Sequence, residues 1–476
     1  MLGRIAVVVA IAVAACSLEI ARAAAASPSA APATPLLGVY RGDAPKGPEK
    51  VDAYSAWLGR EVDLAEAFEP AATWEDVEGR SWQLGAWSAW VHARPGRRLV
   101  LTVPMLPGSP DGSGPTAGAG AGEPVSLGRG AAGAYDAHFA ALARNLVTYR
   151  LGDSILRLGH EFNGGWYAWR AAGAEADFAA YWRRIVTAMR SVPGHALQFN
   201  WNPTLGPGGA RADLAWPGDA YADIVGVDVY DQSWSAGTYP IPSGAAAEDA
   251  QRRQTLVWGQ ILDGSYGLRF WQRFALARGK RLSISEWGVT DRGDGHGGGD
   301  DPEFVAGMWQ FIQNPDNHVA YHVYFDYMAK DGGHQLSTYD GFTSPFPAAA
   351  ATFRRLFGPG APPSTPDTRP RLSRVPNRSA SQPLANRTLP AQAFVFVPAE
   401  SSILRVSFHI DDPKRLRRPL RTDRAAPFDM VGGDASRALS FQAARLRPGW
   451  HTLTVAVRLG DGRLTVGHAR FLRGKL

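Results

Sequence analysis

Cysteine is almost absent from this sequence: the only one among 476 residues is Cys16. One thiol excludes a framework of internal disulfides, so a packed core has to supply the stability. The sequence also lacks a glycine-rich dinucleotide fingerprint after its first strand candidate, which argues against an open nucleotide-binding sheet. No run of Lys or Arg lies beside an aromatic ladder, so the net charge of +6 does not indicate nucleic-acid binding. That charge indicates either a solvated basic surface or attraction to an acidic polysaccharide.

What is abundant is apolar and aromatic character, at 45% and 11% of the residues. Residues 5–15 form an apolar run of signal-peptide length, too short to span a bilayer. Residues 13–16 read VAAC, which resembles a bacterial lipobox that would lipidate Cys16; cleavage after Ala23 is the alternative. We therefore expect a signal peptide over 1–23, a flexible Ala/Pro/Ser-rich tether over 24–35, and a protein that is secreted or bound to the cell envelope, in the periplasm or as an outer-membrane lipoprotein.

Short apolar runs alternate with helical periodicity from residue 36 to residue 357, a pattern typical of βα units around a parallel sheet. Eight strands with interleaved helices predict a closed (β/α)8 TIM barrel of the α/β class. The strand candidates are residues 36–40, 62–68, 98–106, 155–161, 196–202, 224–230, 282–288 and 319–325.

Two glutamates stand at the ends of the fourth and seventh strand candidates, Glu161 and Glu286. In such barrels the reactive residues lie at the carboxyl ends of the strands. A pair of carboxyl groups about 5–5.5 Å apart supports retaining glycoside hydrolysis, with one as general acid/base and the other as nucleophile. Trp201 and Trp287 lie beside predicted strand ends, where each indole either stacks on a sugar ring or packs in the core.

A metal or organic cofactor is not expected at this site. His160-Glu161 begins like the helix of a zinc protease, but Gly164 occupies the position of the second histidine ligand. A glycine-rich loop over residues 293–301 contains three aspartates and is read as a flexible loop, with calcium binding as the alternative. We therefore expect acid/base and nucleophilic catalysis by side chains alone.

The strand-four sequence RLGHEFNGGWY, residues 157–167, resembles the acid/base motif of glycoside hydrolase family 26, a mannanase-like family of clan A barrels. Residues 133–136, 227–231 and 284–288 follow the pattern of the same family in order. The strand-four motif is long and specific, whereas the SEWG sequence around Glu286 alone is weak. The resemblance covers roughly residues 36–357.

The resemblance implies roles for individual residues. Glu161 would be the acid/base and Glu286 the nucleophile, with Tyr230 donating a hydrogen bond to the nucleophile. The remaining substrate-binding or positioning candidates are Arg157, His160, Asn163, Trp166, Trp201 and Trp287. Family members act on β-mannan and, less often, on β-glucan or β-1,3-xylan. The Trp-Arg pair that mannanases carry on strand eight is missing from residues 323–327, so the resemblance does not establish mannan specificity.

The pattern changes beyond the predicted barrel. Residues 358–389 are rich in Pro, Ser and Arg and read as a linker. Residues 390–476 contain short alternating strands without helices, which predict a small immunoglobulin-like β-sandwich acting either as a spacer or as a carbohydrate-binding module.

Together these patterns predict a monomeric, retaining endo-β-glycosidase. Its substrate would be an extracellular polysaccharide, either β-mannan, β-glucan or an exopolysaccharide, cleaved by double displacement. The alternative is a non-catalytic polysaccharide-binding surface protein on a barrel that has lost its activity.

Overall fold

The computed structural model describes residues 34–108, 125–338, 341–359, 368–398, 403–459 and 464–474. The predicted signal peptide with Cys16, nearly all of the tether and most of the glycine-rich loop after the third strand lie outside these ranges. Among the described residues, no helix has the length and apolar character needed to cross a bilayer.

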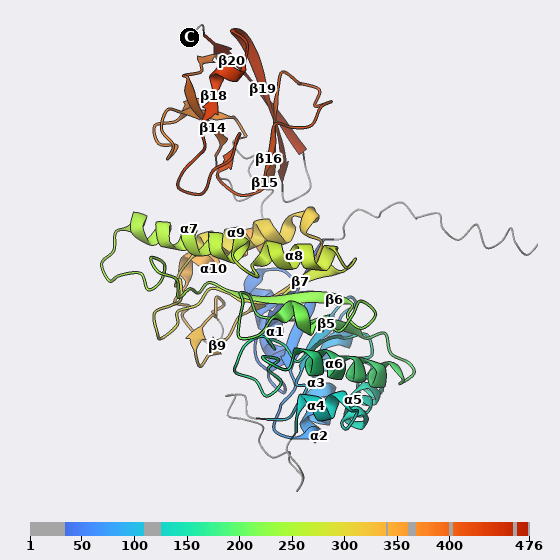
Figure 1. Ribbon diagram of the computed structural model, residues 1–476. Coiled ribbons are helices and arrows are strands. Elements are labelled where there is room, and N and C mark those ends of the chain that lie inside the picture. The colour runs from blue at the N-terminus through green and yellow to red at the C-terminus, as the bar shows by residue number, and fades with distance from the viewer. Residues whose placement is uncertain are drawn as a thin grey trace, which may run out of the picture. The chain divides into compact units, whose positions relative to one another are not determined.

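Eight parallel strands close into a barrel in the order β1 to β8, which confirms the predicted fold (Figure 1). Hydrogen bonds between β1 and β8 close the ring. Three of the eight ranges agree with the sequence prediction at both ends, and the others differ by a few residues. The strands are β1 (Leu36–Tyr40), β2 (Leu64–Phe68), β3 (Arg98–Val103), β4 (Ile155–Leu158), β5 (Gln198–Trp201), β6 (Ile224–Tyr230), β7 (Arg281–Gly288) and β8 (Val319–Phe325).

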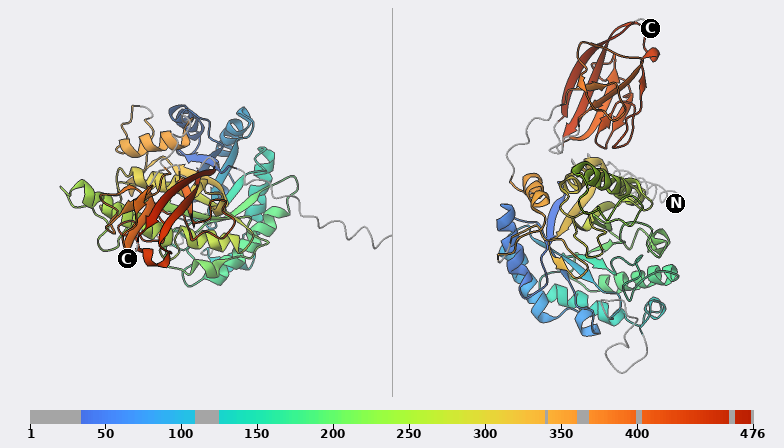
Figure 2. Two further views of the ribbon diagram at one scale, coloured as in Figure 1. Left: turned by 90° about the horizontal axis from the view of Figure 1, so that it is seen from above. Right: turned by 90° about the vertical axis from the view of Figure 1, so that its left-hand side faces the viewer.

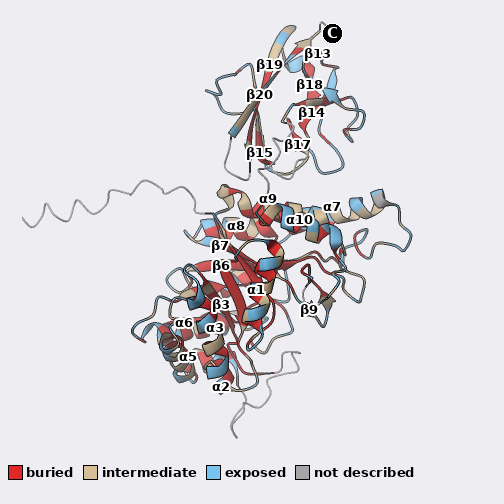
Figure 3. Ribbon diagram, turned by 180° about the vertical axis from the view of Figure 1, so that it is seen from behind, coloured by how far each residue is buried: buried red, intermediate tan, exposed pale blue. Residues whose placement is uncertain are grey.

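Helices cover the outside of this barrel, and their apolar stripes are buried against the strands (Figures 1 and 3). Thr73 and Asp301 cap the first turns of α2 and α9, and α1, α9 and α10 each have a proline there, where its missing N–H costs nothing. The helices are α1 (Gly47–Leu58), α2 (Trp74–Val77), α3 (Ser81–Ala93), α4 (Leu127–Ala131), α5 (Asp136–Thr148), α6 (Glu175–Arg190), α7 (Ala247–Asp263), α8 (Leu268–Leu276), α9 (Pro302–Gln313) and α10 (Pro347–Phe357), with the 3-10 turns η2 (Ala212–Ala215) and η3 (Pro315–Asn317).

The interior of the barrel is layered. One layer is apolar and includes Leu64, Val100, Ile155 and Ile224 from four different strands. Because successive side chains of a strand point to opposite faces, the next inward position on β2, β3 and β4 is two residues further along. Those positions are polar and buried, and they are occupied by Glu66, Thr102 and Arg157. The buried Asn200 of β5 pairs with Arg157 and continues this polar layer.

A bulge interrupts the alternation on β7. Val227 of β6 pairs with Ile284, but the next residue, Asp228, pairs with Glu286, so Ser285 is an extra residue on β7. An inserted residue shifts the following side chains to the opposite face. As a result Glu286 faces the barrel interior and Trp287 faces the helices outside.

The C-terminal part of the chain is all-β and has a core of its own, as predicted (Figure 2). Its strands form two five-stranded sheets, one containing β12, β11, β14, β17 and β18, the other containing β13, β20, β19, β15 and β16. The immunoglobulin-like assignment stays a prediction. The bounds are β11 (Arg371–Ser373), β12 (Gln382–Pro383), β13 (Arg387–Thr388), β14 (Gln392–Val397), β15 (Ile403–Ile410), β16 (Arg421–Asp423), β17 (Phe428–Asp429), β18 (Phe441–Gln442), β19 (Gly449–Leu459) and β20 (Leu464–Arg473), with the turn η4 (Ala443–Arg445).

The linker predicted for residues 358–389 is wrong in its second half. β11, β12 and β13 lie within it, and each pairs with a strand of the C-terminal sheets. Short strands bounded by Pro, Ser and Asn resemble a linker in sequence, because only pairing with distant strands makes them ordered.

Candidate active site

Arg157 is the central charge of the site and is fully buried inside the barrel. Its guanidinium forms ion pairs with Asp228 at 2.8 Å, with Glu286 at 2.8 Å and, through the shortest contact, with Glu66. One of its nitrogens also donates to the hydroxyl of Thr102 at 3.0 Å. Three carboxyl groups therefore surround one fixed positive charge.

Burial raises the affinity of two of these carboxyl groups, those of Glu66 and Asp228, for protons. Burial raises the pKa of Glu66 to about 8, against the opposing charge of Arg157. Burial likewise holds the pKa of Asp228 well above its usual range. Removing an ion from water is costly unless its charge is balanced. Glu66 and Asp228 therefore keep their protons at pH values at which carboxyl groups in water lose them.

Glu286 lies at the edge of this cluster and is 6% exposed. One of its oxygens, Oε1, contacts Arg157, and the other, Oε2, accepts a hydrogen bond of 2.7 Å from the hydroxyl of Tyr230. The Tyr230 hydrogen bond expected from the family resemblance is thus present. The ring of Tyr230 packs against His334 and Phe325, with ring centroids 4.7 and 6.0 Å away. Charge and hydrogen bonding both fix the direction of the Glu286 carboxylate.

Glu161 follows β4 at the same end of the barrel. Its backbone has a φ of 50°, in the left-handed region that side chains other than glycine rarely adopt, and its N–H donates to the carbonyl of Asn202 at 2.8 Å. The indole N–H of Trp166 donates to Glu161 Oε2 at 2.8 Å. Burial and the charge of Glu286 raise the pKa of Glu161 to about 7. The structure therefore holds one glutamate that binds a proton near neutral pH beside a second glutamate that is paired with an arginine.

His160 and Trp166 form the surroundings of Glu161. Burial, together with the charge of Arg157, holds the pKa of His160 well below its usual range, so its ring is neutral. His160 Nε2 lies 2.9 Å from the hydroxyl of Tyr167, and its carbonyl accepts from the indole of Trp169. Trp166 is 44% exposed, so one face of its indole is open to a ligand.

Three of the predicted substrate-binding residues do not face the site. Trp201 is fully buried, donates to the carbonyl of Ala215 and packs in the aromatic core between the strands and the helices. Trp287 is also fully buried, because the β7 bulge turns it outward onto Phe353 and Phe357.

Asn163 is the third of these residues and is a positioning residue. It is fully buried, and its amide donates to the carbonyl of Thr204 and accepts from the N–H of the same residue. The nitrogen and the oxygen of the Asn163 amide are therefore both hydrogen-bonded to the backbone that follows β5. Because the side chain is also fully buried, a substrate does not reach it.

Glu66 is the main residue that the sequence analysis missed. It occupies the middle of β2, in the otherwise apolar run LAEAF. A lone carboxylate in a buried strand is the signal that identifies it, since Glu is almost never fully buried without a partner. A search restricted to strand ends overlooks such a residue.

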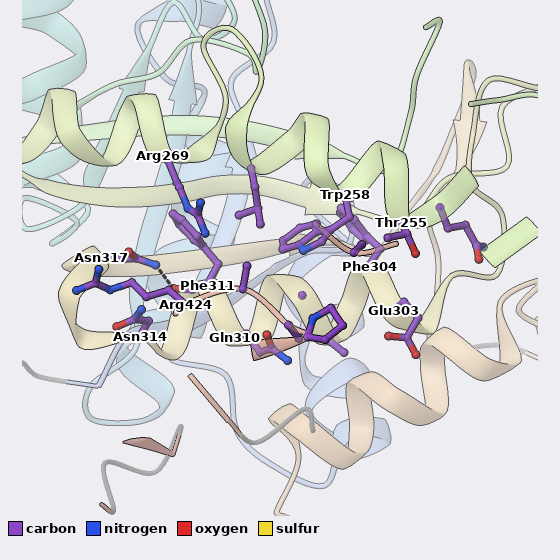
Figure 4. A pocket seen from close by; sticks show the side chains of 18 of the residues that line it. Thr255, Trp258, Arg269, Glu303, Phe304, Gln310, Phe311, Asn314, Asn317 and Arg424 are labelled. Atoms are coloured by element: carbon purple, nitrogen blue, oxygen red, sulfur yellow. Dashed lines mark hydrogen bonds between the residues drawn. The ribbon is translucent and has the colours of Figure 1, made fainter. Parts of the chain in front are cut away.

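The glycine-rich loop over residues 293–301 holds its aspartates in structural contacts. Asp294 pairs with Arg292, Asp300 accepts from the first turn of α10, and Asp301 caps α9. Within the described ranges, no group of three or more His, Cys, Asp or Glu residues is placed to hold a metal ion. Figure 4 shows a hollow on the outer helices, whose lining includes Trp258, Phe304 and Phe311. This hollow is separate from the site around Arg157, Glu161 and Glu286 and shares no lining residue with it.

Comparison with known proteins agrees with this geometry. The model of glycosyl hydrolase family 26 matches residues 137–241, which include Arg157, Glu161 and Tyr230. Over this segment the chain is similar to glycosyl hydrolase family 26. A mannan endo-1,4-beta-mannosidase of Bifidobacterium adolescentis is 36% identical over 86 residues of this chain. The aligned segment covers 17% of the chain and only 9% of the length of that relative.

Solved structures of family 26 enzymes resemble the chain at low identity. A double mutant of the Cellulomonas fimi endo-beta-1,4-mannanase is 16% identical, and the match covers 92% of this chain and 94% of that one with a TM-score of 0.46. The catalytic domain of an endo-beta-1,4-mannanase from Bacillus sp. JAMB-750 is 18% identical, over 69% of this chain and 86% of that one, with a TM-score of 0.47.

Proposed function

We propose that this protein is a retaining endo-β-glycosidase of glycosyl hydrolase family 26 that cleaves a polysaccharide by double displacement. The observation that carries the proposal is the contrast between Glu161, whose pKa is raised to about 7, and Glu286, which is fixed by Arg157 and Tyr230. A proton donor beside an oriented carboxylate is the pair that glycoside hydrolysis requires.

In the first step, the carboxyl group of Glu161 gives its proton to the glycosidic oxygen while the carboxylate of Glu286 attacks the anomeric carbon. The bond to the leaving sugar breaks, and a glycosyl ester forms on Glu286. In the second step, the Glu161 carboxylate takes a proton from water, and the resulting attack on the anomeric carbon releases Glu286. The hydrogen bond from Trp166 stabilises Glu161 after it has lost its proton.

β-1,4-Mannan is the first substrate to test, because the curated relative is described as a mannan endo-1,4-beta-mannosidase. β-Glucans, xylans and exopolysaccharides complete the panel. We also propose that residues 1–15 direct export and that Cys16 becomes the lipidated N-terminus, a proposal supported by the apolar run and the VAAC sequence. Incorporation of radiolabelled palmitate that is abolished by Cys16→Ser tests the lipid attachment.

Product analysis tests the proposed function directly. Purified protein should release oligosaccharides from one member of the panel, and proton NMR of early products should show the β-anomer first. Glu286→Ala should lower the rate about 10⁴-fold or more, and Glu161→Ala about 10²- to 10⁴-fold on unactivated substrate. Glu303→Gln, an exposed carboxyl on α9, is the matched control and should leave the rate unchanged.

Azide distinguishes the two roles. With an activated aryl glycoside, azide should restore turnover in Glu161→Ala and give a β-glycosyl azide, because the glycosyl ester still forms on Glu286. In Glu286→Ala it should attack directly and give the α-glycosyl azide. The alternative function, a non-catalytic polysaccharide-binding protein, would be supported if the unaltered protein and both variants bind the polysaccharide equally and release no product.

A further inference from the structure

Glu161 has a second hydrogen-bonding partner besides Trp166, and it comes from a different loop. Burial and the charge of Glu286 raise the pKa of Glu161, whereas side-chain hydrogen bonds from Trp166 and Thr204 oppose that rise. Thr204 is half-buried and follows β5, which pairs with β4 in the barrel. Its hydroxyl therefore donates to the Glu161 carboxyl group from the neighbouring strand, so residues after two different strands hold the proposed acid/base.

The backbone of Thr204 is fixed from two sides. Its N–H donates to the side-chain oxygen of Asn163 at 2.8 Å, and its carbonyl accepts from the side-chain nitrogen of the same residue at 3.0 Å. Thr204 also forms a parallel bridge with Asp228 of β6. Because a β-branched side chain has few favourable rotamers, a fixed backbone also restricts the direction of the hydroxyl.

Asn163 holds the residues that follow Thr204 as well. Its carbonyl accepts from the N–H of Gly209 at 2.6 Å and from the N–H of Ala210 at 3.3 Å. Gly208 has a φ of 56°, and a Cβ added there would clash with the same carbonyl. The loops after β4 and β5 therefore meet at a distance that only glycine permits, and Asn163 joins them through its side chain and its backbone.

Glu161 depends on such support because its own backbone is strained. Its φ of 50° lies in the left-handed region, and a conformation of this kind persists only where the surroundings hold it. Its N–H donates to the carbonyl of Asn202, two residues before Thr204. The loop after β5 thus contacts both the backbone and the carboxyl group of Glu161, and both contacts exist before a sugar binds.

We propose, on the basis of the proposed function, that Thr204 is a positioning residue for the acid/base. Its hydroxyl holds the Glu161 carboxyl group in the direction from which the glycosidic oxygen receives its proton, and Asn163 holds Thr204 in turn. Because Thr204 acts through Glu161, it affects only the steps in which Glu161 transfers a proton. A misdirected acid slows the departure of a poor leaving group, whereas a leaving group that departs without a proton is unaffected.

Two substrates with different leaving groups test this role at pH 6, below the pKa of Glu161. They are mannotetraose and 2,4-dinitrophenyl β-mannobioside, or the matching pair for the polysaccharide that the substrate panel identifies. Thr204→Val keeps the branched shape and removes the donor. We expect it to lower kcat/KM about tenfold with the oligosaccharide and by less than about twofold with the dinitrophenyl glycoside. With the dinitrophenyl glycoside kcat should still fall, because the second step needs Glu161 as the base.

Two further variants provide the controls. Thr204→Ser keeps the hydroxyl and should retain most of the activity on both substrates. Thr187→Val removes the hydroxyl of an exposed threonine on α6, which donates to the carbonyl of Arg183 in its own helix, and it should change neither rate. Equal losses of kcat/KM with the two substrates in Thr204→Val would show a purely structural role and would overturn the proposal.

A titration without substrate checks the contact itself. Carbon-13 NMR of the glutamate carboxyl groups in the full chain, with the Glu161 signal assigned from Glu161→Gln, should show a higher pKa for Glu161 in Thr204→Val and no change in Thr204→Ser. A pKa that is the same in Thr204→Val and the unaltered protein would overturn the proposal. If the unaltered protein hydrolyses no polysaccharide, the proposed function fails, whereas the titration still decides whether Thr204 acts on Glu161.

Discussion

Two buried arginines, one in each folded part of the chain, have very different surroundings. In the C-terminal sheets, Arg378 forms a two-pronged ion pair with the single carboxylate of Asp429 and donates further hydrogen bonds to two backbone carbonyls. In the barrel, Arg157 faces Glu66, Asp228 and Glu286. One carboxylate therefore balances the charge of Arg378, whereas three carboxyl groups surround the single positive charge of Arg157.

This difference separates a structural ion pair from a candidate active site. A balanced pair satisfies its own hydrogen bonds and fixes a loop, so nothing remains for a ligand. An unbalanced cluster costs stability, and proteins retain such clusters mainly at sites where shifted pKa values are needed. The contrast with Arg378 therefore supports a catalytic role for the carboxyl groups around Arg157.

Removing each arginine gives the largest expected effect. Arg157→Met would leave three buried carboxyl groups facing one another, and we expect it to lower the free energy of unfolding of the barrel by about 3–5 kcal/mol at pH 8. Arg378→Met leaves one carboxylate, which can take up a proton, so the loss should be smaller. Urea unfolding of the full chain, followed by tryptophan fluorescence and circular dichroism, measures both.

Acidification sharpens this comparison. Protonation of Glu66 and Asp228 should recover more stability in Arg157→Met than protonation of Asp429 recovers in Arg378→Met between pH 8 and pH 5. If Arg157→Met fails to fold, Arg157→Lys provides the comparison, since it keeps the charge and loses the planar fork. Equal losses in the two arginine variants at every pH would show that the surplus of carboxyl groups has no energetic consequence.

The pH dependence of the rate tests the acid in the barrel cluster. Because Glu161 must carry a proton to act and its pKa is about 7, kcat/KM should be maintained below pH 7 and fall about tenfold per unit above it. The hydrogen bond from Trp166 lowers this pKa, so Trp166→Phe should move the alkaline limb to higher pH. A limb that stays in place, or moves to lower pH, would contradict the assignment of Glu161 as the acid.

Removing one of the three carboxyl groups around Arg157 should change the stability less than removing Arg157 itself. The pKa of Glu66 is raised to about 8 in the folded chain from 4.5, so the folded state binds the extra proton and stability falls as pH rises between these values. Glu66→Gln removes that loss, and its melting temperature relative to the unaltered protein should therefore be higher at pH 9 than at pH 5. A difference that does not change with pH would show that Glu66 does not titrate in this range.

The sequence predicted the barrel and the position of Glu161 well, because both depend on local patterns. Eight apolar runs with interleaved helical stripes are sufficient to indicate a βα barrel. The orientation of Trp287 could not be predicted in this way. Strict alternation from Ser283 would place Trp287 inside the barrel and Glu286 outside, and only pairing with β6 shows that Ser285 is an extra residue.

Other features depended on contacts between residues far apart in the chain. Trp201 looked like a sugar-stacking residue because it stands near a strand end, but α8 and η2 bury it. Glu66 and Glu69 lie three residues apart, and the sequence alone gave neither a role. Glu66 contacts Arg157 of β4, and Glu69 is buried with neither carboxyl oxygen hydrogen-bonded.

The smallest expected effect concerns the hydrogen bond that orients the nucleophile. Tyr230→Phe removes the 2.7 Å contact to Glu286 and leaves Arg157 in place, so kcat should fall about tenfold with little change in stability. Tyr239→Phe is the matched control, since Tyr239 donates an equivalent 2.8 Å hydrogen bond to a different buried carboxyl group, that of Asp231. If both variants reduce kcat equally, the loss reflects a disturbed loop after β6; if only Tyr230→Phe does, the hydroxyl acts on the Glu286 carboxylate.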